Sequence, residues 1–434
     1  MERTVVVDRH DQVDRRKWFG ISTAAVLGSL GPSARGTDGP AAKPKGALRP
    51  KPVAAVVTAY EKLLHADVLV TKILAGWGQD GGPGPALKLA SLYVDQFGRK
   101  DLARPRAAKY GVPIFDSIEG ALTLGGDQIA VDGVISIGEH GNYPVNAKGQ
   151  QLYPRRRFFD AIADSFEKHG RVVPVFSDKH LGPQWSDVAA IYRRAQDMKI
   201  PMMAGSSLPV TFRRPSQTIP MGCEIEAAVG IGYSDLDRYG SHILDCFQCL
   251  VERRRDAEGG VEWVHCLQGD AMWQAVDQGV VRADLMNAAL RLLPTRPKSD
   301  LRGSSSSALF LFRYTDGLLG AVLMLPHYVA GMGVALQVRG QQEPWAVHFE
   351  ERVQPAIPHF AYLLKAIERM VHTGTPSYPV ERTVLTSGIL DRALTSRFKG
   401  HQRLLTPELQ IGYQPVDYPF APHIDLQSDP RQRL

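Results

Sequence analysis

The chain has 434 residues, of which 44% are hydrophobic and 22% are charged, and its formal net charge is +6. That length suits about two or three domains with sizeable cores, and the mixed, aperiodic composition excludes collagen, low-complexity and coiled-coil proteins. Residues 1–50 hold nine Lys/Arg and five Asp/Glu, so the remaining residues are nearly neutral and lack the charge signature of a nucleic-acid-binding protein.

A short N-terminal pattern resembles an export signal. Residues 14–19 are Asp-Arg-Arg-Lys-Trp-Phe, and a mildly apolar stretch follows over 21–30. A twin arginine before an aromatic residue and a short apolar run is typical of a twin-arginine (Tat) signal. The run has about half the ~20 residues that span a bilayer, so we expect no stable membrane span.

We therefore expect residues 1–51 to be a Tat-like signal and a flexible linker, because the stretch 32–52 is rich in Gly, Pro, Ala and Lys. The folded protein would then be exported to the periplasm. The alternative is a basic tail that exports nothing and leaves the protein in the cytoplasm.

From residue 52 to residue 205, short apolar strands alternate with helical patterns. The strands are predicted over 53–57, 87–94, 113–115, 133–137, 172–176 and 201–204, and the helices over 63–74, 102–110, 157–169 and 185–198. This alternation is typical of βαβ units and a parallel sheet. It predicts a Rossmann-like nucleotide-binding domain over 52–205, in which ligands bind at the carboxyl ends of the strands.

Polar residues follow these strands, where a ligand would bind. They are Thr58 and Tyr60 after the first strand, Asp95 after the second, Gly138, Glu139 and His140 after the fourth, and Asp178, Lys179 and His180 after the fifth. Asp95 either binds a ribose hydroxyl, as an acid at this place does in dinucleotide folds, or only forms a turn. The first turn, residues 58–63, has no glycine where the G-x-G-x-x-G fingerprint would place them.

After residue 205 the pattern changes to strands joined by short turns. Strands are predicted over 219–232, 308–314, 318–325, 333–339 and 345–349, and helices over 242–250, 270–278, 358–372 and 381–397, the second of these as a helix or turn. Successive strands with short turns imply antiparallel pairing. We expect a C-terminal α+β domain over 206–434 with a mostly antiparallel, open sheet for substrate binding and oligomerisation.

All four cysteines lie between Cys223 and Cys266. Cys246 and Cys249 have the C-x-x-C spacing of a redox pair or half a zinc site. Because both fall on one face of an apolar helical pattern, we expect buried core thiols instead.

Five segments carry a resemblance to a known family. They are Asp101-Leu-Ala103, Ala107-Ala-Lys-Tyr-Gly-Val-Pro113, Asp132-Gly-Val134, Pro174-Val-Phe-Ser-Asp-Lys-His180 and Gly240-Ser-His242 with Asp245. Their order and spacing resemble the glucose–fructose oxidoreductase/inositol dehydrogenase/MocA (Gfo/Idh/MocA) family over roughly residues 52–400. The resemblance implies a Rossmann domain, a C-terminal domain with an open antiparallel sheet that pairs subunits through its exposed face, and NAD or NADP as cofactor.

The resemblance also implies roles for single residues. Lys179 matches the lysine of the family's Glu-Lys-Pro motif, which contacts substrate and nicotinamide, and here the motif is Asp178-Lys179-His180. His242 matches the catalytic histidine of the family's D-x-G-x-H pattern. The aspartate of that pattern would fall at position 238, where this chain has Arg238, and the nearest acid is Asp237. Asp95 matches the ribose-binding acid. The turn Gly138-Glu139-His140 matches the turn beside the cofactor.

We therefore expect an NAD(P)-dependent oxidoreductase that acts on a CH–OH group of a sugar, polyol or glycoside. His242 would be the acid/base and Lys179 would position the hydroxyl. Asp178 and His180 would complete the catalytic cluster, and the cofactor would contact Thr58, Tyr60, Asp95, Gly138, Glu139, His140 and Lys179. Lys179→Ala and His242→Ala are expected to abolish turnover and leave folding intact.

Three other functions remain open. His140, His180 and His242 with Glu139 or Asp178 have the chemistry of metal ligands, as in an isomerase or lyase. The resemblance also admits an NAD-assisted glycosidase. A third reading is a non-catalytic relative that binds a carbohydrate.

Overall fold

The computed structural model describes residues 48–432, so the Tat-like signal and most of the expected linker lie outside the described residues. Six parallel strands form the first sheet, in the order β3-β2-β1-β4-β5-β6. Their bounds are β1 Lys51–Val57, β2 Leu87–Val94, β3 Ile114–Phe115, β4 Gly133–Ile137, β5 Val175–Asp178 and β6 Met202–Gly205. The expected Rossmann-like sheet is confirmed, and its strand order reverses between β1 and β4, the place where such sheets bind ligands.

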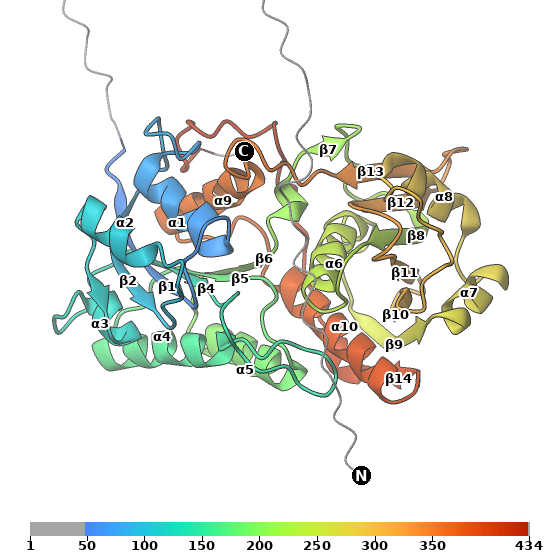
Figure 1. The fold of residues 1–434 in the computed structure, drawn as a ribbon, viewed down its shortest axis with the longest axis horizontal. Helices are drawn as coiled ribbons and strands as arrows, with labels where there is room; N and C mark the ends of the chain where they lie inside the picture. Colours follow the sequence, from blue (N-terminus) through green and yellow to red (C-terminus); the bar gives the residue numbers. More distant parts are fainter. Residues whose placement is uncertain (1–47, 433–434) are drawn as a thin grey trace, which may run out of the picture. The chain divides into compact units, whose positions relative to one another are not determined.

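Helices cover both faces of this sheet (Figure 1). They are α1 His65–Ala75, α2 Ala103–Tyr110, α3 Ile118–Thr123, α4 Arg155–His169, α5 Trp185–Asp197 and, from late in the chain, α9 His359–Thr373. Val53, Ala55 and Val57 of β1 pack with α1 and α9, whereas Ala54 and Val56 pack with α3, α4 and α5. This alternation follows from the two-residue period of a strand. The helix α9 belongs to the core of the first sheet, although it lies in the half of the sequence that forms the second.

The second sheet has eight strands in the order β14-β9-β10-β11-β8-β12-β13-β7. Their bounds are β7 Arg213–Arg214, β8 Ile225–Gly232, β9 Val261–Gln268, β10 Ala308–Tyr314, β11 Leu319–Met324, β12 Met332–Val338, β13 Trp345–Phe349 and β14 Leu404–Leu405. Pairing is antiparallel except between β11 and β8, so the mostly antiparallel sheet is confirmed. The short turns between successive strands predicted that β11 and β12 would pair with each other. They do not, because β8 lies between them.

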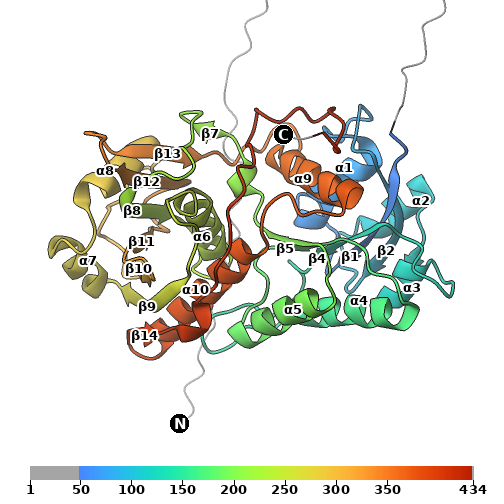
Figure 2. The ribbon, with the colours of Figure 1, turned by 180° about the vertical axis from the view of Figure 1, so that it is seen from behind.

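Helices also lie on both faces of the second sheet (Figure 2). The helices α6 Arg238–Val251 and α10 Glu381–Phe398 pack on the side toward the first sheet, and α7 Asp270–Asp277 and α8 Ala283–Leu292 pack on the other side. Trp273 of α7 and Leu285 of α8 contact strand residues such as Leu309 and Leu323 in one core. These two helices cover part of the face that the family resemblance assigned to a partner subunit, and oligomerisation through this sheet stays a prediction.

Several boundaries differ from the predicted ones for local reasons. The strand β5 starts at Val175 and not at residue 172, because Pro174 has no N–H for the sheet. It extends through Asp178, which therefore ends the strand. The elements that the sequence pattern did not predict are α3, α8, β7, β9, β14 and two short 3₁₀ turns, η2 Leu208–Val210 and η3 Pro407–Leu409.

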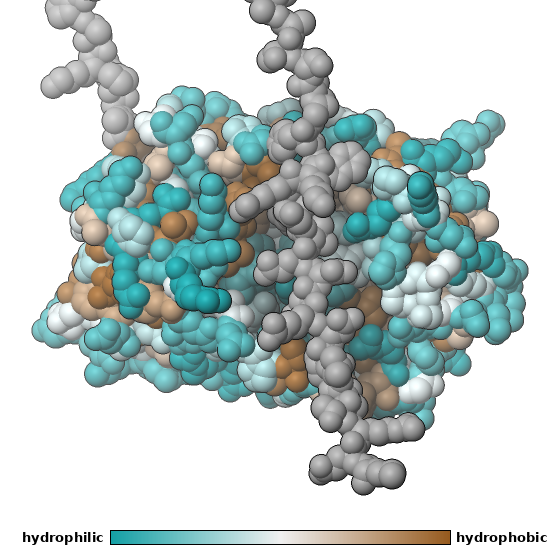
Figure 3. All heavy atoms as spheres, in the orientation of Figure 1, coloured by the Kyte–Doolittle hydropathy of each residue, from teal (hydrophilic) through white to brown (hydrophobic). Residues whose placement is uncertain are grey.

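Cys246 and Cys249 are buried and free on α6, which confirms that they are core thiols. Among residues 48–432, no helix is both long and apolar enough to cross a bilayer. On the face drawn in Figure 3 the described surface is mostly hydrophilic, and its apolar residues form scattered patches.

Candidate functional site

A buried ion pair lies at the carboxyl ends of β4 and β5. Glu139 follows β4 after Gly138, and Lys179 follows β5; they are 3% and 2% exposed. The Nζ atom of Lys179 lies 2.7 and 2.8 Å from the two carboxylate oxygens of Glu139. Glycine at 138 leaves room for Arg155, because a Cβ there would lie 2.7 Å from Cγ of Arg155 and would force that side chain to move.

Arg155, the first residue of α4, completes this pair. Its Nη2 atom donates to the carbonyl of Lys179 at 2.6 Å and lies 3.4 Å from Oε2 of Glu139. Burial alone would raise the pKa of Glu139, but the positive charge of Lys179 chiefly holds that pKa well below its usual value. Glu139 is therefore a buried anion at neutral pH.

His242 lies on α6, near the same edge of the first sheet. Its Nδ1 atom is 2.5 Å from Oγ of Ser206, which follows β6. The backbone N–H of Ser206 in turn donates to Asp245 of α6 at 2.8 Å. Burial, and then the charge of Lys179, lower the pKa of His242 well below its usual value. The imidazole is therefore neutral, and the contact with Ser206 orients its ring.

Gly205 makes this arrangement of Ser206 and His242 achievable. Its φ is +119°, and a Cβ there would lie 2.5 Å from Oγ1 of Thr383 and 3.0 Å from Oδ2 of Asp245. Only glycine tolerates both the backbone conformation and the close approach of α6 and α10.

His65, which the sequence analysis did not select, lies at the centre of the cluster. Its ring centroid is 5.3 Å from that of His140 and 6.4 Å from that of His242. Its Nδ1 atom is 2.6 Å from Oδ2 of Asp178, while Oδ1 of Asp178 is buried without a hydrogen-bond partner. His65 is the first residue of α1, so its position just after the first predicted strand and turn was the signal that could have found it.

The structure brings Glu139, His140, Lys179 and His242 together around His65. The side chain of His180, in contrast, contacts groups outside this cluster. The Nδ1 atom of His180 is 2.6 Å from the carbonyl of Gly182, and its Nε2 atom is 3.5 Å from Oδ1 of Asp237. Asp237, which lies one residue before the position of the acid in the family's D-x-G-x-H pattern, therefore pairs with His180 and not with His242.

The residues expected at the ribose end of a cofactor are bound within the protein. Asp95 accepts hydrogen bonds from Tyr93 at 2.8 Å, from Tyr143 at 2.6 Å and from Arg157 at 2.6 Å. The amide of Gln96 exchanges hydrogen bonds with the backbone of Asn142 at 3.0 and 2.8 Å. The segment 138–153 thus crosses the ends of β1 and β2.

The residues after β1 are also engaged. The hydroxyl of Thr58 donates to the carbonyl of Glu139, and the hydroxyl of the buried Tyr60 is 2.7 Å from that of Thr71. The donors of Lys179 and the neutral His242 fit the nicotinamide end of a dinucleotide. The ribose of the cofactor would need Asp95, which Tyr143 now occupies with a hydrogen bond. The pyrophosphate would lie against the turn 58–64, whose residues carry side chains where the usual fingerprint has glycines.

A second set of groups has the chemistry of metal ligands. His65, Glu139 and His140 each offer one ligand atom, and these atoms lie within 4.8 Å of one another; no other such group occurs within residues 48–432. Of the metal ligands that the sequence suggested, only Glu139 and His140 are in this set, because His180 and His242 are bound elsewhere. Burial lowers the pKa of His140 to about 3, so its ring is neutral, as a ligand requires.

No protein-family model matches the chain, and no curated protein matches its sequence. Solved structures do match its fold. GenD2 from gentamicin A biosynthesis, solved in complex with NAD, is 12% identical with a TM-score of 0.53, over 84% of this chain and 99% of that one. A myo-inositol dehydrogenase from Corynebacterium glutamicum is 13% identical with a TM-score of 0.51, over 82% and 99%. A myo-inositol 2-dehydrogenase from Lactobacillus plantarum is 10% identical with a TM-score of 0.51, over 82% and 99%.

The chain therefore shares its fold with these solved dehydrogenase structures. The fold that the sequence motifs implied is thereby confirmed. At 10–13% identity the likeness extends no further than the fold, so the chemistry of the site is argued from this chain's own residues.

Proposed function

We propose that the protein is an NAD(P)-dependent oxidoreductase that acts on a CH–OH group of a sugar or polyol. The observation that carries the proposal is the neutral, oriented His242 on α6, close enough to the buried Lys179 for the lysine charge to lower its pKa, with Lys179 at the strand ends where such folds bind ligands. The shared fold supports it, since GenD2 was solved with NAD and two other neighbours are inositol dehydrogenases.

Oxidation of an alcohol requires a base for the hydroxyl proton and an acceptor for the hydride. NAD(P), when bound, supplies the acceptor. His242, neutral at neutral pH, takes the hydroxyl proton on Nε2, because Nδ1 is used by Ser206. Lys179 has three N–H donors, and two of them are directed at Glu139. The third donates to the substrate oxygen and holds it near His242.

Replacing His242 with glutamine is expected to lower kcat by about 10²–10⁴-fold, because the base is lost. The assay follows reduced nicotinamide when the purified full chain is given NAD or NADP with a panel of sugars and polyols. His327→Gln, at an exposed histidine, is the matched control and should retain wild-type kcat. Equal kcat in the two variants would remove His242 from the mechanism.

Replacing Tyr143 with phenylalanine is expected to tighten NAD(P) binding by about 10-fold, the value of one hydrogen bond to a charged acceptor. The substitution frees an oxygen of Asp95 for a ribose hydroxyl. Calorimetric titration of the full chain with NAD and NADP measures this, with Tyr110→Phe as the control. Weaker or unchanged binding in Tyr143→Phe would show that Asp95 does not meet the cofactor.

A metal-dependent enzyme is the second candidate, because His65, Glu139 and His140 offer three ligand atoms within 4.8 Å of one another, the number of protein ligands in many catalytic zinc sites. The hydrogen bond from Nδ1 of His65 to Asp178 leaves Nε2 for a metal, as carboxylate partners of ligating histidines do. Stoichiometric zinc after dialysis, without nucleotide binding, would favour this candidate. Retention of neither zinc nor nucleotide would favour a non-catalytic carbohydrate-binding relative.

We also propose export of the folded protein, on the sequence of residues 14–30 alone. Fractionation of producing cells tests this proposal. Recovery of the protein only in the cytoplasm would contradict it.

A further inference from the structure

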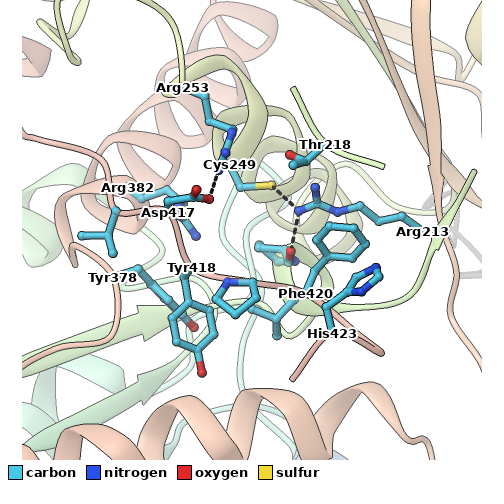
Figure 4. A pocket seen from close by; sticks show the side chains of 14 residues that line it. Arg213, Thr218, Cys249, Arg253, Tyr378, Arg382, Asp417, Tyr418, Phe420 and His423 are labelled. Carbon is cyan, nitrogen blue, oxygen red and sulfur yellow. Dashed lines mark hydrogen bonds and ion pairs between the residues drawn. The ribbon is translucent and has the colours of Figure 1, made fainter. Parts of the chain in front are cut away.

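A cavity of about 170 Å³ lies away from the candidate site, among η2, the end of α6, the start of α10 and the C-terminal segment 416–423 (Figure 4). Three arginines line it: Arg213, Arg253 and Arg382. Figure 4 shows the guanidinium group of Arg213 reaching toward Cys249 from one side, with the other two arginines across the cavity.

Two of the three arginines have carboxylate partners. Arg253 pairs with Asp417 at 2.8 Å, and Arg382 donates to Glu252 at 2.9 Å. Their charges are therefore compensated within the protein. The charge of Asp417, the acid in the cavity wall, is compensated in the same way.

Arg213 is different. It is 8% exposed, and among residues 48–432 no carboxylate lies within ion-pair distance of it. Its Nη2 atom donates to the carbonyl of Pro209 at 2.9 Å and lies 3.8 Å from Sγ of Cys249, while its Nε atom is buried without a partner. The ring centroid of Phe420 is 4.1 Å from its Cζ atom.

Burying a charge without a counter-ion is unfavourable, and contact with an aromatic ring offsets only part of that cost. The burial also lowers the pKa of Arg213, which is the direction expected of a cation without a partner. The hydroxyl of Tyr378, which is 3% exposed, is a second buried polar group in the wall without a hydrogen-bond partner. An anionic group in the cavity would give Arg213 a counter-ion, and an oxygen of the same ligand next to Tyr378, which also lines the cavity, would give its hydroxyl a partner.

We propose that this cavity binds the carboxylate or phosphate group of a small molecule, with Arg213 as its counter-ion and Tyr378 as a second donor. Cys249 lies two turns of α6 after His242. The cavity is thus separate from the candidate active site, and its occupancy can be measured without an activity assay.

The test measures thermal unfolding of the full chain in phosphate, acetate or chloride at constant ionic strength. We expect Tm to rise saturably with phosphate or acetate and not with chloride, because a ligand that binds only the folded state stabilises it. A rise with phosphate alone identifies a phosphate ligand, and a rise with acetate alone identifies a carboxylate.

In Arg213→Met the affinity is expected to fall by at least about 10-fold, the loss of a charge-assisted hydrogen bond. Tyr378→Phe is the milder variant, with several-fold weaker binding and an intact fold, because its hydroxyl bonds to no described residue. Arg255→Gln, at an exposed arginine, is the matched control for the loss of one positive charge. Equal Tm in the three salts, or an unchanged response in both cavity variants, would overturn the proposal.

Discussion

Replacing Lys179 with alanine is expected to lower the free energy of unfolding by about 3–5 kcal/mol, because the buried charge of Glu139 loses its two shortest ionic contacts and keeps only the longer one to Arg155 at 3.4 Å. Both oxygens of that carboxylate now bond to Lys179, and both residues are at most 3% exposed. This revises the sequence-based expectation that Lys179→Ala leaves folding intact. Chemical denaturation of the full chain measures the loss.

The double variant Lys179→Met/Glu139→Gln should recover most of this stability, since it removes both charges together. Lys168→Ala is the matched control: it breaks an exposed pair with Glu119 and should leave the free energy of unfolding nearly unchanged. If Lys179→Ala were as mild as Lys168→Ala, Glu139 would not be a buried anion held by Lys179.

Acidification from pH 7 to pH 5 is expected to destabilise the fold by about 2 kcal/mol for each buried neutral histidine. Burial lowers the pKa of His359 to about 3, and burial together with Lys179 holds the pKa of His242 well below its usual value. Their unfolded-state pKa is about 6.5. Above that pH neither state binds the proton, whereas below it the unfolded chain binds protons that the folded chain excludes, so stability falls as the pH falls. The same holds for His140, whose side chain is 25% exposed and whose contribution is smaller.

Denaturation curves at pH 7, 6 and 5 measure this dependence. Glu139 and Asp237 stay ionised in the folded protein over that range, because their pKa values are held below the usual carboxyl value, and they add little to the slope because an unfolded carboxyl group is mostly ionised at pH 5 as well. His359→Asn should reduce proton uptake on unfolding by about one, and the exposed-site control His327→Asn should not. An unchanged slope in His359→Asn would show that His359 is protonated in the folded protein.

The local pattern predicted most of the fold. The strands β2, β4, β10 and β13 have the predicted bounds, because the strand period and the turns that end it are properties of a few adjacent residues. The two-residue strands β7 and β14 exist only through pairing with distant partners, so no local signal could predict them. The motif Asp178-Lys179-His180 was correctly placed at a strand end for the same local reason.

The sequence by itself determined a parallel sheet followed by a mostly antiparallel one, with Glu139, Lys179 and their polar neighbours at strand ends. Only the tertiary structure decided what each group contacts. It placed β8 between β11 and β12, returned α9 to the first sheet, set His65 against Asp178 and bonded Asp95 to Tyr143. These contacts join residues far apart in the chain, and they depend on burial and pairing that short-range periodicity does not encode.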